Sequence, residues 1–452
     1  MTGKISILIL MDVLLSLLSV YSGYFIRYGV PPDTGFFLRG LGVNVGVFAA
    51  VLVLCSYLSE LYNQEWKAKK EILIKTITAT VLSFFLLTAA YYLVPSVLIG
   101  RGLLALSLVS FAVFQFLLHV TFQISASLPT FAKRVLILGT GPLANKMGAV
   151  VNTMSHNYVL AGYVNCTNET VLVPLHSIIG SGEGLAETVQ KEKAHKIVVS
   201  LSERRGAFPL RDVLNCKLDG IEVIDAPSFY EQVTGKLLIE NITPSWFIFS
   251  DGFRITQSKM LLKRVFDMFT SVAGLLVALP LIPFVLLAIR IDSPGPVLFR
   301  QSRVGQKGKE FALYKFRTMR DGAEDATGAV WSQENDPRVT RIGRILRQSR
   351  LDEIPQLYNV LKGDMSLVGP RPERPEFISE LREAIPFYTE RHFVKPGITG
   401  WAQIKYPYGA SVEDSLEKLR YDLFYIKHLS FFLDLLILVE TAKVMLFGRG
   451  GR

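Results

Sequence analysis

Four apolar segments open the chain and restrict what it can fold into. They cover residues 5–25, 43–61, 72–94 and 103–122. Each is about 20 residues long, which lets a helix span the hydrocarbon core of a bilayer. The first is too long for the apolar core of a signal peptide and has no obvious small-residue cleavage site, so we expect it to be retained. The sequence therefore predicts a four-helix transmembrane bundle over residues 1–128.

Composition and charge agree with a membrane protein. Hydrophobic residues make up 50% of the chain, charged residues only 19%, and the mean hydropathy is +0.33. The net charge of +10 fits a protein that contacts anionic lipid or binds phosphates. A nucleic acid would explain the charge but not the apolar runs, so we expect no nucleic-acid partner. The three cysteines are isolated and indicate neither disulfides nor a zinc site.

Basic residues around the four segments indicate an orientation. Lys4, the lysines at 67, 69 and 70, and Lys133 with Arg134 fall on one side, against Arg27, Arg39 and Arg101 on the other. Because basic loops prefer the cytoplasm, the N terminus is predicted to be cytoplasmic.

The pattern changes beyond residue 133 to that of an α/β domain. Expected strands at 134–138, 158–164, 195–201 and 221–224 alternate with helices at 185–193 and 210–218, which predicts a parallel sheet with covering helices. Gly139, Gly141 and Ala144 follow the first strand in the outline of a dinucleotide fingerprint. The next strand ends at Asn165 and Cys166, without the acid that holds a ribose. We interpret residues 129–250 as a Rossmann-like domain with a structural or regulatory role.

Residues 265–289 form another apolar run, interrupted by Pro280 and Pro283. Basic residues flank it on both sides, and the prolines force a break in a helix. We predict a re-entrant helix that enters and leaves one leaflet; the alternative is a fifth span, which would place the rest of the chain outside. The tail at 429–447 is apolar but carries three charged residues. It is predicted to lie in the membrane interface, with a spanning helix left open.

The region from 294 to 425 combines glycines with Lys and Arg, a mixture that lets a backbone approach phosphates while cations neutralise them. Lys315 and Arg317 are two residues apart and would share a face of an extended strand. Arg371 stands between two prolines, which predicts a positioned guanidinium.

An adjacent acid pair, Asp352 and Glu353, lies within this basic region, with Pro355 just after it. Because proline is tolerated in the first turn of a helix, the pair is predicted at a helix N terminus, whose dipole would keep both carboxylates ionised. Such a pair can bind Mg²⁺, and one member can attack phosphorus. The alternative is that the acids only cap the helix.

The blocks Lys-Phe-Arg-Thr-Met, Leu-Asp-Glu-Ile-Pro-Gln-Leu, Gly-Asp-Met-Ser-Leu-Val-Gly-Pro-Arg-Pro and Lys-Pro-Gly-Ile-Thr-Gly-Trp occur in this order. They resemble the monotopic polyprenyl-phosphate glycosyl-1-phosphate transferases, the bacterial sugar transferases that start exopolysaccharide, capsule or O-antigen assembly. The four N-terminal spans and the Rossmann-like domain resemble the large class of that family. Residues 251–452 would then be the catalytic domain, mainly α-helical, with the re-entrant helix at 265–289.

The resemblance implies that a UDP-sugar and undecaprenyl phosphate give undecaprenyl-diphosphate-sugar and UMP, with Mg²⁺, at the cytoplasmic face of the bacterial inner membrane. It implies that Asp352 is the covalent nucleophile and that Glu353 is its partner, the two also binding the metal. The predicted substrate-binding residues are Lys315, Arg317, Arg347, Arg371 and Arg374. The family usually has a small residue where this chain has Arg350. The sugar, the polymer, the role of the Rossmann-like domain and the oligomeric state are left open, with a homodimer as one option.

Two rival hypotheses remain. The Gly139 loop would suit a membrane-anchored, NAD-dependent nucleotide-sugar dehydratase, although the Tyr358 and Lys362 pair that it would use lies far downstream. A non-enzymatic assembly or regulatory protein would use the acid pair only as a cap.

Overall fold

The computed structural model describes residues 3–32, 41–59, 61–62, 69–97, 99–126, 132–154, 158–166, 170–201, 208–242, 246–247, 250–323, 336–406, 409 and 411–446. The chain divides into two compact units, Met1–Ala132 and Lys133–Arg452. The predicted domain boundary at 128–129 lies outside the described residues.

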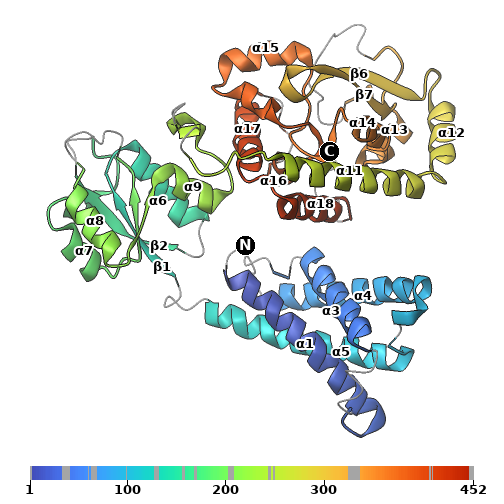
Figure 1. Ribbon diagram of the computed structural model, residues 1–452, viewed down its shortest axis with the longest axis horizontal. Helices are drawn as coiled ribbons and strands as arrows, with labels where there is room; N and C mark the ends of the chain where they lie inside the picture. Colours follow the sequence, from blue (N-terminus) through green and yellow to red (C-terminus); the bar gives the residue numbers. More distant parts are fainter. Residues whose placement is uncertain are drawn as a thin grey trace. The chain divides into compact units, whose positions relative to one another are not determined.

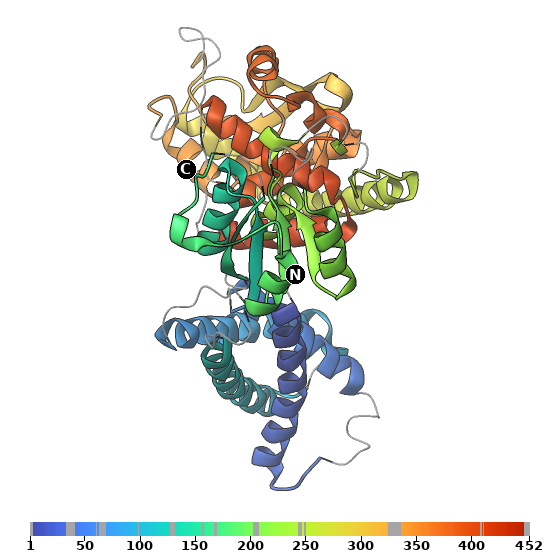
Figure 2. The same ribbon diagram turned by 90° about the vertical axis from the view of Figure 1, so that its left-hand side faces the viewer.

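The first unit is a helical bundle, drawn in blue to teal in Figure 2. It contains α1 (Gly3–Tyr28), α3 (Leu41–Leu58), α4 (Lys69–Leu93) and α5 (Arg101–Ala126). Segments of α1, α4 and α5 are long and apolar enough to cross a membrane, whereas the apolar part of α3, Asn44–Leu58, is shorter. The prediction of apolar N-terminal helices in a membrane protein is therefore confirmed.

A buried polar network joins the bundle helices. The Asp12 carboxylate of α1 accepts hydrogen bonds from the Tyr62 hydroxyl at 2.7 Å and from the Gln115 amide of α5 at 2.6 Å. His119 Nε2 lies 3.3 Å from the same carboxylate oxygen. Asp12, Gln115 and His119 are fully buried. Polar contacts of this kind stabilise helix association in an apolar environment and fix the helices relative to one another.

The second unit begins with a five-stranded parallel sheet in the order β3-β2-β1-β4-β5. The strands are β1 (Lys133–Leu138), β2 (Tyr158–Asn165), β3 (Ile178–Ser181), β4 (Lys196–Val199) and β5 (Glu222–Asp225). Helices α6 (Pro142–Met154) and α9 (Ala226–Thr234) cover one face, and α7 (Leu185–Lys191) and α8 (Leu210–Leu218) cover the other (Figure 1). The predicted parallel sheet is confirmed; β3 and α9 were not predicted.

The remainder of the second unit is mainly helical. Its helices are α11 (Gln257–Ala278), α12 (Ile282–Asp292), α13 (Arg341–Gln348), α14 (Gln356–Lys362), α15 (Pro375–Ala384), α16 (Trp401–Lys405), α17 (Val412–Lys427) and α18 (Phe431–Leu446). The strands form two small sheets: β6 (Leu298–Val304) pairs antiparallel with β7 (Glu310–Phe316), and β8 (Ser366–Val368) pairs parallel with β9 (Gly397–Thr399). One large core joins these elements.

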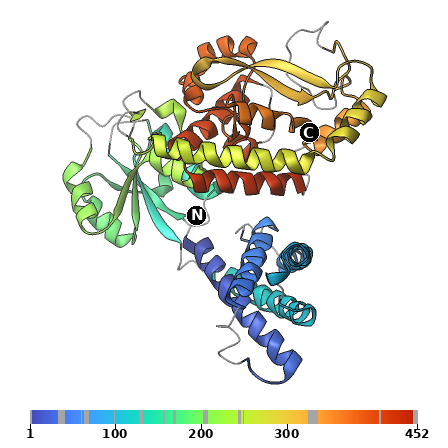
Figure 3. The same cartoon turned by 45° about the vertical axis from the view of Figure 1, so that its right-hand side comes forward.

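Helices α11 and α12 meet at a bend of 64°, visible in Figure 3, between Ala278 and Ile282. The bend falls at the predicted proline break. The first half of α11 is bound firmly to the surrounding domain: Lys263 pairs with Asp434 of α18 at 2.7 Å, and Arg264 donates to the backbone carbonyls of Val360 and Leu361. Asp434, one of the three charged residues in the tail that was predicted to lie in the membrane interface, is therefore buried and paired.

The sheet domain and the helical domain contact each other through specific polar groups. Glu231 of α9 is buried and accepts from Lys427 at 2.6 Å and lies 2.5 Å from His428 Nε2. The Trp401 indole donates to the Gly235 carbonyl at 2.8 Å. Leu237, just after α9, packs in the core of the helical domain. These contacts explain why residues 133–452 form one compact unit.

Candidate active site

The β6–β7 hairpin positions Lys315. Asn359 of α14 is fully buried, accepts from Tyr314 N at 3.1 Å and donates to the Ala312 carbonyl at 2.7 Å. The amide thus takes the place of a neighbouring strand along β7 and fixes this strand against α14. Lys315 follows directly, so its ammonium group is held close to the turn that precedes α14.

The acid pair lies in that turn. Leu351–Glu353 form a single 3₁₀ turn, and α14 begins after Pro355 without a side-chain cap. The pair was predicted at a helix N terminus; the structure places it in a separate turn before α14, and neither acid caps that helix. Arg350 enters the turn with φ 57° and ψ 14°, a left-handed conformation that costs a non-glycine residue of order 1 kcal/mol.

Three cations converge on one oxygen of Glu353. Lys315 Nζ is 3.2 Å from Oε1, Arg371 Nη2 is 3.0 Å from it, and Arg350 Nη1 is 3.6 Å from it. Asp352 and Glu353 are both buried, with 6% and 8% of their surface exposed. In the part of the chain that the structure describes, the buried Oδ1 of Asp352 has no hydrogen-bond partner. One carboxylate is therefore neutralised and the other presents an unsatisfied oxygen.

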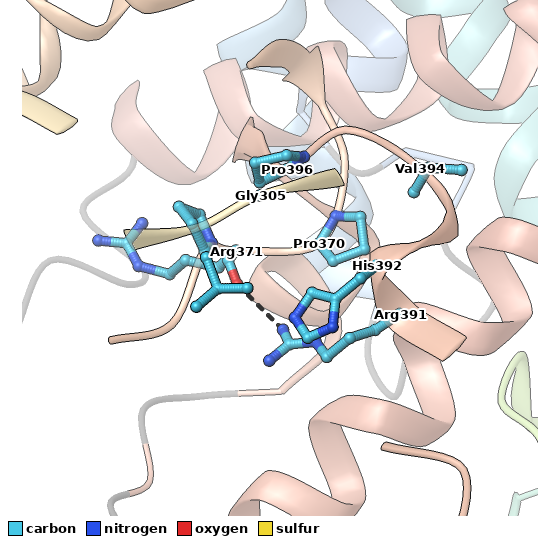
Figure 4. A pocket seen from close by; sticks show the side chains of 9 residues that line it. Gly305, Pro370, Arg371, Arg391, His392, Val394 and Pro396 are labelled. Atoms are coloured by element: carbon cyan, nitrogen blue, oxygen red, sulfur yellow. Dashed lines mark hydrogen bonds between the residues drawn. The ribbon is translucent and has the colours of Figure 1, made fainter. Parts of the chain in front are cut away.

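The loop after β8 positions Arg371. Gly369 N donates to the Thr399 carbonyl, and a Cβ at Gly369 would lie 2.4 Å from the Lys395 carbonyl oxygen, so only glycine fits there. Arg391 then donates to the Arg371 carbonyl at 3.0 Å, drawn as the dashed line in Figure 4, and pairs with the buried Asp422 at 2.8 Å. Sequence reasoning missed Arg391 because no motif places it beside Arg371.

The pKa values of the two acids shift in opposite directions. Burial raises the pKa of Asp352, the Glu353 charge adds to this, and Lys315 and Arg371 only partly offset it. Burial would also raise the pKa of Glu353, but the charges of Lys315, Arg371 and Arg350 outweigh it and lower that pKa to about 2. Burial and the neighbouring side-chain charges are the causes of both shifts.

The other predicted substrate-binding residues have hydrogen-bond, ion-pair or ring contacts elsewhere in the domain. Arg347 Nε donates to the Thr318 hydroxyl at 2.9 Å, and its charge lowers the pKa of Asp352. Arg317 lies beyond the end of β7 and donates to the Ser293 carbonyl at 2.6 Å. It therefore does not meet the same partner as Lys315. Arg374 precedes α15, with Glu376 at 3.6 Å and the Phe377 ring at 5.8 Å.

The donor set at the pair is small for a divalent metal. Among the described residues no group of three or more His, Cys, Asp or Glu side chains could hold a metal ion. Mg²⁺ is usually bound by one or two carboxylates together with water and substrate phosphates. The unsatisfied Asp352 oxygen fits that pattern, with the substrate's diphosphate supplying further oxygens.

Two cavities lie close to the site. One, of about 10 Å³, lies among Gly305, Pro370, Arg371, Arg391 and His392 (Figure 4) and has room for about one water molecule. The other, of about 190 Å³, opens beside the acid pair. It is lined by Arg350, Glu353, Ile354, Leu357, Ile398, Thr399, Gln403, Ile404, Thr441 and Val444.

The glycine loop of the sheet domain does not support the dehydratase hypothesis. Strand β2 ends at Asn165, and no acid stands there to hold a ribose. Leu172 N donates to the Thr140 carbonyl at 2.9 Å, so the segment after β2 lies against the loop that a pyrophosphate would need. Tyr358 and Lys362 belong to the short α14 of the other domain.

Comparison with known proteins agrees with the resemblance seen in the motifs. A family model described as bacterial sugar transferase matches residues 258–448. The undecaprenyl-phosphate glucose phosphotransferase of Komagataeibacter xylinus is 36% identical over 326 residues, which are 70% of this chain and 60% of the relative. The UDP-N-acetylgalactosamine-undecaprenyl-phosphate N-acetylgalactosaminephosphotransferase of Aeromonas hydrophila is 39% identical over 242 residues, which are 54% of this chain and 56% of the relative.

A shorter relative is covered almost completely. Exopolysaccharide production protein PSS of Rhizobium leguminosarum bv. phaseoli is 43% identical over 187 residues, which are 40% of this chain and 94% of the relative. The chain thus belongs to the bacterial sugar transferase family, the polyprenyl-phosphate glycosyl-1-phosphate transferases. The matches span less than two thirds of the Komagataeibacter and Aeromonas proteins.

The opposite pKa shifts predict opposite effects on stability. Glu353→Gln leaves Lys315 and Arg371 without their buried counter-charge and should lower the free energy of unfolding by roughly 3 kcal/mol near neutral pH. The pKa of Glu353 is lowered from 4.5 to about 2. The ionised Glu353 therefore stabilises the fold fully above about pH 4.5, and this contribution is lost as the pH falls through about 2. Asp352→Asn should be neutral or stabilising, because burial penalises the ionised form that it removes.

Thermal unfolding of the purified variants in one detergent at near-neutral pH measures both effects. Equal losses of Tm for the two variants would contradict the assignment of Glu353 as the charge-compensated member of the pair.

Proposed function

We propose that the protein transfers a sugar-1-phosphate from a UDP-sugar to undecaprenyl phosphate, giving undecaprenyl-diphosphate-sugar and UMP. This would be the first membrane step of exopolysaccharide, capsule or O-antigen assembly. The observation that carries the proposal is the acid pair itself: an unsatisfied Asp352 oxygen beside a Glu353 neutralised by three cations. The names of the relatives agree with this chemistry.

In the first step, an Asp352 oxygen attacks the phosphorus that carries the sugar. The bond between that phosphorus and the bridging oxygen breaks, and UMP leaves with the bond's electron pair. Asp352 suits this role because its Oδ1 is buried and, within the described part of the chain, has no hydrogen bond to lose. Lys315 and Arg371, which lie beside Glu353, would stabilise the charge of the diphosphate.

In the second step, an oxygen of the lipid phosphate attacks the same phosphorus. The bond to Asp352 breaks, the carboxylate is restored, and the sugar is now joined to the lipid through a diphosphate. The lipid phosphate needs no deprotonation to attack, so direct transfer without an aspartyl intermediate is the competing mechanism.

Mg²⁺ would be held by Asp352 and Glu353 together with the donor's phosphates. When bound, it would reduce the electrostatic repulsion between the two carboxylates and the diphosphate. The cations around Glu353 remain in place to fix the orientation of that side chain.

A re-entrant arrangement of α11 and α12 supports this chemistry at a membrane surface. Near one end of the pair, Lys263 and Arg264 are bonded to the helical domain. Near the other end, Ile289 packs with Phe316 and Leu346 of the same domain. The region around the bend has exposed apolar side chains suited to lipid: Leu276, Val277, Leu279, Leu281, Phe284 and Leu287. Both ends therefore return to one side, which we take to be the cytoplasmic face of the inner membrane.

The activity assay uses purified protein, undecaprenyl phosphate, Mg²⁺ and a panel of UDP-sugars, with UMP release measured. Asp352→Asn should lower kcat at least ~10³-fold, or roughly 4 kcal/mol of barrier. Glu353→Gln should also lower kcat severely, since Lys315 and Arg371 lose the carboxylate that orients them.

EDTA should abolish UMP release and added Mg²⁺ should restore it.

Glu380→Gln, at an exposed acid of α15, is the matched control and should keep wild-type activity. No UMP release with any UDP-sugar would contradict the proposed function. Full activity of Asp352→Asn would return the pair to a structural role, and full activity in excess chelator would overturn the metal assignment.

The topology is tested by chemical labelling. Single cysteines placed near Lys259 and near Gln301 should react alike with an impermeant thiol reagent applied to inside-out vesicles, because both ends of the α11–α12 pair return to one face. Opposite labelling would mean a full span and would contradict the re-entrant helix.

A further inference from the structure

The 190 Å³ cavity beside the acid pair has walls from three parts of the chain. The turn at Arg350–Glu353 and the start of α14 form one wall, β9 and α16 form the second, and α18 forms the third. Helix α18 packs alongside α11 in both Figure 1 and Figure 3, and the Lys263–Asp434 pair joins the two helices. The cavity therefore lies between the catalytic turn and the helices that carry exposed apolar surface.

Most of the cavity wall is apolar. Its apolar members are Ile354, Leu357, Ile398, Ile404 and Val444. The hydroxyls of Thr399 and Thr441 lie 2.6 Å apart, and Thr441 donates to the Ile437 carbonyl at 2.7 Å. These hydroxyls satisfy each other and offer little to a sugar.

One polar atom of the wall is unsatisfied. The Gln403 amide nitrogen donates to the Ile398 carbonyl at 3.2 Å, but its buried oxygen has no hydrogen-bond partner among the described residues. A single acceptor is less than a hexose with several hydroxyls requires, whereas a hydrocarbon chain suits the rest of the wall.

The charged end of the cavity is Arg350 with Glu353. The Arg350 backbone is left-handed, a conformation that favours glycine or asparagine, so the backbone gains nothing from arginine at this position. Its guanidinium lies farther from the Glu353 oxygen than the groups of Lys315 and Arg371 do, at 3.6 Å against 3.2 and 3.0 Å. Arg350 can thus pair with an incoming anion while Glu353 keeps two closer cations.

We propose that this cavity binds the acceptor lipid, with the first isoprene units of the polyprenyl phosphate against its apolar wall and the lipid phosphate paired with Arg350. The lipid phosphate would then stand next to Asp352, where the second step needs it. This inference rests on the proposed function and assigns Arg350 and α18 to the acceptor, leaving Lys315 and Arg371 to the donor.

The test separates the two substrates kinetically. Arg350→Gly removes the guanidinium and relieves the left-handed backbone, and Glu353 keeps its two closer cations, Lys315 and Arg371, so the variant should still fold. The KM for undecaprenyl phosphate should rise at least about tenfold, the size of one charge-assisted hydrogen bond, while the KM for the UDP-sugar changes less than about twofold. Arg350→Lys should recover part of the loss. Arg344→Ala, at an exposed arginine of α13, is the control and should change neither KM.

A second variant tests the apolar wall. Ile404→Trp fills the cavity and should raise the KM for undecaprenyl phosphate without changing UMP release from the UDP-sugar in the absence of acceptor. A raised KM for the UDP-sugar in either variant would mean that the cavity holds the sugar and would overturn the inference. Unchanged KM values for both substrates would overturn it as well. If wild-type protein shows no transfer at all, the proposed function fails, and that result is distinct from these.

Discussion

The burial of two adjacent carboxyl groups is the constraint on which the catalytic part of this structure depends. A buried carboxylate is costly unless cations compensate it, and the cations at Glu353 come from distant parts of the chain. Lys315 arrives at the end of β7, Arg371 arrives from the loop after β8, and Arg350 precedes the turn. The hairpin, the small parallel sheet and the turn must therefore all be in place before the pair is stable. Asn359, which fixes β7 to α14, serves this requirement directly.

Neighbouring cations compensate the two buried carboxyl groups unequally, and this difference indicates a separate role for each acid. Glu353 forms three ion pairs, whereas one buried oxygen of Asp352 has no hydrogen-bond partner among the residues that the structure describes. A residue that holds cations in position and a residue that presents a free oxygen are complementary roles. The bend between α11 and α12 leaves exposed apolar side chains in the same domain as this pair, where the proposed lipid and nucleotide-sugar substrates would meet. The Lys263–Asp434 pair keeps α18 against α11 and so completes the cavity proposed for the lipid.

The sequence motifs predicted the acid pair and two of its cations. They did not predict the residues whose role depends on contacts between distant parts of the chain. Ordered motifs predicted the acid pair, Lys315 and Arg371, and the structure brings these four together. Arg317 was predicted to share a face of an extended strand with Lys315, but β7 ends at Phe316, one residue before it. Arg391 and Asn359 were missed, since each acts through a partner that no local pattern indicates. In the sheet domain, the missed β3 is only four residues long and carries little periodicity.

The most direct test of the central claim is a search for the covalent intermediate on Asp352. Wild-type protein given a UDP-sugar without lipid acceptor should release up to one equivalent of UMP. The peptide that contains Asp352 should gain the mass of a phosphosugar, and Asp352→Asn should show neither effect. If wild-type protein shows no burst and no adduct, and if initial rates require both substrates bound together, then Asp352 is not a nucleophile and the covalent account is wrong.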